Sequence, residues 1–153
     1  MKNEAKDHTG LICKWALILA VGIMLTIYLT HSEWYDKRGS EGNYSAGAYL
    51  DGGREKLTYR ANQRIYYEFE IENGGVIFDL LDENDNVVYR VGAVQSSSGY
   101  IVIGEDVAPG TYYSHEYATT ADTVARSHVV WQKKQTNWER LLADFLIIHK
   151  SDW

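Results

Sequence analysis

The feature that most constrains this chain is an apolar segment near its N-terminus, residues 11–30, with the sequence LICKWALILAVGIMLTIYLT. A helix needs about 20 mainly apolar residues to cross a bilayer, and this segment has that length. Its one charged residue, Lys14, lies in the first turn, where a long side chain can reach the headgroups. Trp15 and Tyr28 are placed like interfacial aromatic anchors. We therefore predict a transmembrane helix over 11–30.

Basic residues on the two sides of this segment predict its orientation. Three lysines precede or open the segment, and two basic residues follow it closely: Lys2, Lys6 and Lys14, against Lys37 and Arg38. Cytoplasmic flanks carry the excess of basic residues, so residues 1–10 are expected to be a cytoplasmic tail. The prediction is a single-pass protein of the cell membrane with its remaining residues outside the cytoplasm. A cleaved signal peptide is the alternative, although no A-x-A pattern follows the apolar core.

Length, charge and cysteine count limit the number of domains, the kinds of partner and the cross-links that this chain can have. With 153 residues, there is room for one modest domain and an appendage. The formal charge of -6 argues against a nucleic-acid partner, since the nearest basic cluster is the single pair Lys133-Lys134. Cys13 is the one cysteine, so neither an intrachain disulfide nor a cysteine-based zinc cluster can form.

The run IYYEFEIE, residues 65–72, alternates between two kinds of position. The odd positions from Ile65 to Ile71 are apolar or aromatic, and the even positions hold Tyr or Glu. A period of two predicts a strand with one buried face. Asn73-Gly74-Gly75 then supplies residues that tolerate positive φ, which predicts a hairpin or a turn between sheets.

Further short runs of this kind, near 76–80, 87–91, 100–103, 111–118 and 127–134, are separated by polar or Pro-Gly turns. They predict a mainly β chain with an antiparallel β-sandwich over 56–134. Residues 31–55 lack sustained periodicity and are interpreted as a linker, or as a loose first strand. DENDN, residues 82–86, predicts a plain turn; its spacing also imitates the start of a calcium loop, but Val87 stands where that loop needs glycine.

The C-terminal segment 136–150 changes to a helical period. Thr136 precedes Glu139 by three residues, which is a capping-box pattern, and apolar residues follow on one face. We predict a short amphipathic helix. Its apolar face is expected to pack on the sandwich, to contact a partner, or to lie on the membrane surface.

The order of strands and turns over 56–134 resembles small extracytoplasmic sandwich modules of the GOLD type and of the bacterial pre-peptidase C-terminal type. The segments that carry this resemblance are YYEFEI, VIFDLLDENDNVVYR and SGYIVIGEDVAPGTYYSHEY. It implies an antiparallel sandwich and, from the GOLD modules, a role in protein recognition. Those GOLD proteins carry their membrane helix after the sandwich, whereas here the apolar segment comes first.

No catalytic pattern is evident in the sequence. The five histidines are scattered without metal-ligand spacing, and SSSG lacks the context of a nucleophile elbow. We therefore expect no cofactor and no enzymatic activity. The leading hypothesis is a membrane-anchored protein-binding module that serves as an accessory subunit of a membrane complex, and the alternative is a carbohydrate-binding module of the envelope. The residues expected to contact the partner are aromatic or apolar: Tyr66, Tyr112, Tyr113, Tyr117, Trp138, Leu142 and Phe145.

Overall fold

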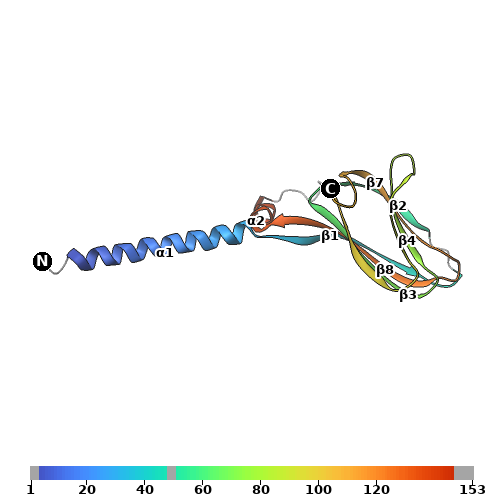
Figure 1. The fold of residues 1–153 in the computed structure, drawn as a ribbon, viewed down its shortest axis with the longest axis horizontal. Helices are drawn as coiled ribbons and strands as arrows, with labels where there is room; N and C mark the ends of the chain where they lie inside the picture. Colours follow the sequence, from blue (N-terminus) through green and yellow to red (C-terminus); the bar gives the residue numbers. More distant parts are fainter. Residues whose placement is uncertain (1–3, 48–50, 147–153) are drawn as a thin grey trace. The chain divides into compact units, whose positions relative to one another are not determined.

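The computed structural model describes the backbone of residues 4–47 and 51–146, and the side chains of residues 10–47 and 54–144 (Figure 1). The chain divides into a helical unit, built from the first and last helices, and a sandwich unit that covers residues 34–134. In chain order the elements are α1 (Glu4–Thr30), β1 (Ser32–Tyr44), β2 (Asp51–Tyr59), β3 (Gln63–Asn73), β4 (Val76–Leu81), β5 (Val87–Ala93), β6 (Ser97–Val102), β7 (Gly110–Ala118), β8 (Val124–Thr136) and α2 (Asn137–Leu146).

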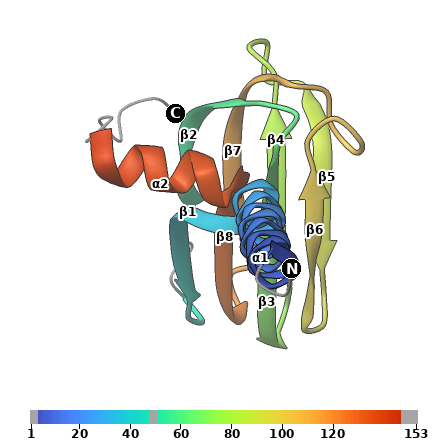
Figure 2. The same cartoon turned by 90° about the vertical axis from the view of Figure 1, so that its left-hand side faces the viewer.

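The strands form two four-stranded sheets that face each other. Sheet A has the order β1-β8-β3-β6, and sheet B has the order β2-β7-β4-β5 (Figure 2). Every strand pair whose register is described is antiparallel. The predicted fold class, a mainly β antiparallel sandwich with an N-terminal apolar helix and a short C-terminal helix, is confirmed.

Strand β3 shows the alternation that the sequence predicts. Ile65 is fully buried and Phe69 is 1% exposed, whereas Glu68 and Glu70 on the other face are exposed. β3 is hydrogen-bonded on both sides, to β8 and to β6. Its inward side chains join residues of sheet B in one core, whose largest fully buried members are Phe69, Phe78, Ile65, Leu80, Ile101 and Ile103.

The Asn73-Gly74-Gly75 turn carries the chain from sheet A to sheet B. Gly74 has a φ of 75°, a left-handed conformation that glycine adopts without a steric penalty. A Cβ added there would lie 2.9 Å from the Cα of Thr123, so the close approach also needs glycine. Of the two predicted alternatives, a turn between sheets is therefore the one observed.

Of the two interpretations of residues 31–55, a linker or a loose first strand, the structure shows a strand and corrects the linker. The segment contains β1, which is an edge strand of sheet A, and the beginning of β2. Most side chains of β1 are exposed or half-buried, and Tyr44 at its end is its one fully buried side chain. An edge strand with so little buried surface has no need of apolar alternation, which is why periodicity did not indicate it.

The helical unit contains the two helices outside the sandwich. Within α1, residues Gly10–Thr30 are long and apolar enough to cross a membrane. At the start of α2, the Thr136 hydroxyl accepts the N–H of Glu139 at 3.2 Å, and the Glu139 carboxylate accepts the N–H of Thr136 at 2.8 Å. This reciprocal pair confirms the predicted capping box. Residues 147–150 of the predicted helix lie outside the described residues.

The turn between β4 and β5 is organised by the Asp82 carboxylate. Its oxygens accept the backbone N–H groups of Asn84 and Asn86, both at 2.8 Å, and the side-chain amide of Asn86 at 2.9 Å. These hydrogen bonds hold the pKa of Asp82 below its ordinary value, with the side-chain bond from Asn86 as the largest cause. The predicted plain turn is confirmed, since this carboxylate is committed to the turn itself.

One buried hydrogen bond joins the two sheets. The indole N–H of Trp131, on β8 of sheet A, donates to the hydroxyl of Tyr59, on β2 of sheet B, at 2.9 Å. Trp131 is 5% exposed and Tyr59 is 3% exposed, so water cannot replace either partner. Burial also raises the pKa of the Tyr59 phenol, which keeps it neutral.

We predict that Tyr59→Phe lowers the free energy of unfolding of the full chain in detergent by about 1–3 kcal/mol, because it leaves the Trp131 N–H buried without an acceptor. Urea unfolding followed by circular dichroism measures the change. Tyr112→Phe is the matched control: its hydroxyl donates to the Ala108 carbonyl at an exposed site, so we expect a loss of about 0.5 kcal/mol or less. Equal losses in both variants would contradict the role of the bond between sheets.

A second prediction concerns acid. A carboxyl whose pKa is lower in the folded state stabilises the fold above its unfolded pKa, and the contribution is lost as pH falls through the folded value. Asp82→Asn should therefore lower the urea midpoint at pH 7, and the difference from the unmodified chain should shrink as pH falls below the ordinary value of 3.8. Glu83→Gln removes a carboxylate from the same turn without removing those hydrogen bonds, so its midpoint should follow the unmodified chain. A pH-independent Asp82→Asn effect would show that the charge is irrelevant.

Candidate binding face

The four tyrosines predicted to contact a partner do not lie together. Tyr66 is on the outer face of sheet A, whereas Tyr113 and Tyr117 are on the outer face of sheet B. Tyr112 points inward, packs against the core and donates its hydroxyl to the Ala108 carbonyl at 2.9 Å. The structure therefore offers two faces to compare, and it removes Tyr112 from both.

The other predicted contacts are on α2. Trp138 is 48% exposed and Leu142 is half-buried. Phe145 falls within α2, but its side chain lies outside the described residues.

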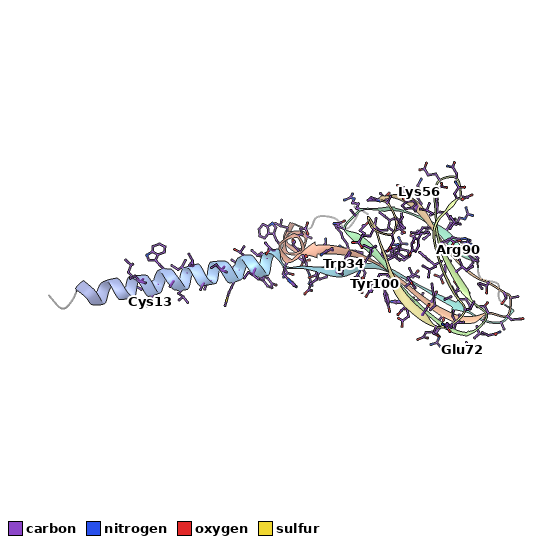
Figure 3. The ribbon with its side chains drawn as sticks, in the orientation of Figure 1. Cys13, Trp34, Lys56, Glu72, Arg90 and Tyr100 are labelled. Atoms are coloured by element: carbon purple, nitrogen blue, oxygen red, sulfur yellow. The ribbon has the colours of Figure 1, made fainter. Side chains whose placement is uncertain are left out.

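A stack of three side chains from three strands lies on the outer face of sheet A. Figure 3 labels its two aromatic members, Trp34 and Tyr100. The guanidinium carbon of Arg64, on β3, is 4.3 Å from the ring centroid of Trp34 on β1 and 4.0 Å from that of Tyr100 on β6. A guanidinium at this distance from a ring is attracted by the negative π-face. Arg64 therefore connects the two aromatic rings across the sheet.

Hydrogen bonds fix the position of Arg64 within this stack. Its Nε donates to Oε1 of Gln132 at 2.7 Å, and Nε2 of Gln132 donates to the Asp36 carboxylate at 2.7 Å. Gln132 is on β8, between β1 and β3, so these hydrogen bonds run from β3 across β8 to β1. The cluster is thus held in place before any partner arrives.

Tyr66 extends this cluster along β3. It is directly opposite Tyr100 in the β3–β6 register, and the two ring centroids are 5.2 Å apart. Its hydroxyl donates to the Glu68 carboxylate at 3.1 Å. Desolvation first, and then this hydrogen bond, raise the pKa of the Tyr66 phenol. We call Trp34, Arg64, Tyr66 and Tyr100 the sheet A cluster.

Sequence reasoning found Tyr66 but missed the other three members. Arg64 and Tyr66 are two residues apart on an alternating strand, so their shared face was readable. Tyr100 was assigned to a strand, but its position beside Tyr66 depends on the register between β3 and β6. Trp34 lies in the segment 31–55, which has no sustained periodicity, so the sequence does not indicate the place of Trp34 in a sheet.

The outer face of sheet B is organised around a buried carboxylate that pairs with a half-exposed arginine. Asp79, 2% exposed, receives two hydrogen bonds of 2.7 Å from the guanidinium of Arg90, on the neighbouring strand β5. The hydroxyl of Tyr117 also donates to Asp79, at 3.2 Å, and its ring stacks on His115 with centroids 4.9 Å apart. The hydrogen bonds and charge of Asp79 raise the pKa of Arg90. On this face the Tyr117 hydroxyl is committed to satisfying a buried carboxylate.

A small pocket opens between β1 and sheet B, with a volume of about 180 Å³. Small-molecule sites commonly measure about 300–1,000 Å³, so this pocket is small for such a ligand. Its two inward carboxylates already have partners: Glu116 accepts the Tyr44 hydroxyl at 2.5 Å, and Glu55 pairs with Arg38 at 2.5 Å. The polar groups of this pocket are therefore used within the sandwich and do not indicate a ligand site.

Four carboxylates of the sandwich have structural partners. Asp79 is bound by Arg90, Asp82 holds its turn, Asp85 pairs with Arg54, and Asp106 accepts the N–H of Val102 at 2.7 Å. Within residues 10–47 and 54–144, no three His, Cys, Asp or Glu side chains lie close enough together to hold a metal ion.

Comparisons with known proteins identify no family. No family model and no curated protein matches the chain. Solved structures similar to it include TehB from Haemophilus influenzae (14% identity, 76% of this chain, TM-score 0.39), of which the chain spans only 37%. They also include PliG from Aeromonas hydrophila, a periplasmic inhibitor of g-type lysozyme, at 14% identity and a TM-score of 0.35. That match covers 69% of this chain and 88% of PliG. A third is the carbohydrate-binding module CBM36, solved with calcium and xylotriose, at 11% identity and a TM-score of 0.34. That match covers 70% of this chain and 96% of the module. Similarity at this level assigns neither a family nor a function, and the resemblance to GOLD or pre-peptidase C-terminal modules remains a prediction.

We predict that Trp34 and Arg64 are energetically coupled. In a double-mutant cycle with Trp34→Ala and Arg64→Ala, urea unfolding should give a coupling free energy of about 0.5–1 kcal/mol, as for a cation–π contact at a partly exposed site. The matched control pairs Trp34→Ala with Lys56→Ala, because Lys56 lies on sheet B beside Tyr113. Those two losses should be additive. Additivity in the Trp34–Arg64 cycle as well would mean that the stack contributes nothing to stability.

Proposed function

We propose that this protein is a membrane-anchored, non-catalytic binding module, whose sandwich lies outside the cytoplasm and recognises a partner protein through the sheet A cluster. α1 supplies the anchor, since Gly10–Thr30 has the length and composition of a membrane span. The observation that carries the proposal is the stack of Arg64 between Trp34 and Tyr100.

The residue types of the cluster support a protein partner. Trp, Tyr and Arg are the residues most enriched among those that dominate the binding energy of protein interfaces. Tyr100 is 48% exposed although its ring already contacts Arg64, so it has surface left for a partner. Because Arg64 is fixed by Gln132, little side-chain entropy remains to be lost on binding.

Carbohydrate is the second candidate ligand for the same face. The neighbouring rings of Tyr66 and Tyr100 are flanked by the polar side chains of Glu68 and Gln132. Aromatic rings provide flat apolar surface, and such polar groups can hydrogen-bond sugar hydroxyls. A protein partner and a carbohydrate would therefore bind the same face, and identifying the bound species distinguishes the two candidates.

Site-specific photo-crosslinking in the native membrane tests the proposal. A benzophenone side chain at Ser98, an exposed position of β6 two residues before Tyr100, replaces no member of the cluster, although it removes the Ser98 hydroxyl that hydrogen-bonds Tyr66. The matched control places it at Val88, which is 43% exposed on β5 of sheet B. We expect a discrete adduct with a second protein from position 98 only. Trp34→Ala or Arg64→Ala should reduce its yield at least several-fold.

Two outcomes would contradict a protein partner at this face. One is an adduct from position 98 that Trp34→Ala and Arg64→Ala leave unchanged, and the other is an adduct from position 88 alone. Retardation of the detergent-solubilised chain in gels that contain envelope polysaccharide, abolished by Tyr66→Ala but retained by Tyr113→Ala, would replace the protein partner by a sugar.

A further inference from the structure

The beginning of α2 is hydrogen-bonded to the end of α1. The backbone N–H of Asn137 donates to the His31 carbonyl at 3.0 Å, and its side-chain amide donates to the Tyr28 carbonyl at 2.8 Å. Tyr28 lies in the last turn of α1, and its carbonyl also accepts the backbone N–H of His31 at 3.3 Å. Asn137 therefore connects the start of α2 to the last turn of α1 and to the residue that follows it, and it fixes where α2 begins.

α2 does not continue the direction of α1. In Figure 1 α2 is seen nearly end-on beside the end of α1, and in Figure 2, where α1 points toward the viewer, α2 extends across the view. The two helices, which belong to the same unit, therefore lie crosswise. If α1 crosses a bilayer, a helix that crosses its end lies along the bilayer surface.

The level of α2 follows from the same two hydrogen bonds. The apolar segment of α1 ends at Thr30, so the carbonyls of Tyr28 and His31 are at the boundary between hydrocarbon and headgroups. α2 starts at that level. This is the depth at which amphipathic helices bury their apolar faces and at which tryptophan is enriched.

The exposed face of α2 has the composition that this position requires. Trp138 is 48% exposed and Leu141 is 39% exposed, and Leu142 lies on the same face at helical spacing. Glu139, Arg140 and Asp144 occupy the remaining arc. The polar face has no excess of cations, so attraction to anionic lipid cannot be its driving force; apolar burial and the short connection to α1 provide it.

We infer that α2 is an interfacial helix, whose Trp138–Leu141–Leu142 face inserts into the leaflet where α1 ends. The occupant of this face is the headgroup–acyl boundary of the bilayer, anionic or zwitterionic. The inference rests on the proposed function, because it needs α1 in a membrane. It adds a second contact with the bilayer at the point where β8 ends.

Electron paramagnetic resonance with single nitroxide labels tests this inference in the full chain, with Cys13→Ala to remove the native thiol. Labels are placed at Leu141→Cys on the apolar face, at Ala143→Cys on the polar face as matched control, and at Met24→Cys to report on α1. The chain is reconstituted into phosphatidylcholine bilayers, with and without phosphatidylserine. Collision rates with oxygen, which concentrates in lipid, and with a water-soluble nickel chelate give the depth of each label.

We expect the ratio of oxygen to nickel collisions at position 141 to exceed that at position 143 several-fold, equally in both lipid mixtures, with position 24 deepest. Asn137→Ala should decrease the ratio at 141 without changing that at 24. Equal ratios at 141 and 143, or a label at 141 shielded from both reagents by protein, with 24 still in lipid, would overturn the inference and leave the anchor standing. A water-exposed label at 24 would instead refute the anchor.

Discussion

The two-residue period of β3 is the constraint on which both the core and the candidate binding face depend. One set of its side chains, including Ile65 and Phe69, fills the centre of the sandwich, while the other set, including Arg64 and Tyr66, forms the middle of the sheet A cluster. A slip of one residue would exchange the two sets. Such a slip would expose Ile65 and Phe69 and bury Arg64, so the burial of one face fixes the register of β3 with β8 and β6. Core packing therefore also determines which side chains reach the outer face.

Local pattern predicted the elements well, and it predicted their arrangement poorly. The strands at β3 to β8, the glycine turn after Asn73 and the capping box of α2 depend on neighbours in sequence, and all are present. β1 was predicted only as an alternative to a linker, because an edge strand buries few side chains and shows no apolar alternation. The cluster was missed because Trp34, Arg64 and Tyr100 are distant in sequence, and only the order and register of the sheet bring them together.

The two outer faces show how hydrogen bonding decides the use of an aromatic residue. On sheet B, the hydroxyl of Tyr117 is committed to the buried carboxylate of Asp79, alongside the bidentate Arg90. On sheet A, the guanidinium of Arg64 makes cation–π contacts with the faces of two aromatic rings. The hydrogen bonds there join Arg64 to Gln132 and Gln132 to Asp36, so they do not involve the rings. Similar residues therefore hold a buried carboxylate on one side and form the proposed contact surface on the other. Composition alone does not distinguish these uses.

The order of strands in sheet A also determines when the domain can be completed during synthesis. β1 is the first strand to be made, yet its neighbour in the sheet is β8, the last. The bond from Gln132 to Asp36 spans 96 residues, and that from Gly42 to the Ser127 hydroxyl spans 85. Such non-local pairing slows folding, because a long loop must close before its contacts form. While the later strands are still being made, β1 remains an unpaired edge available to other chains, directly after the apolar helix.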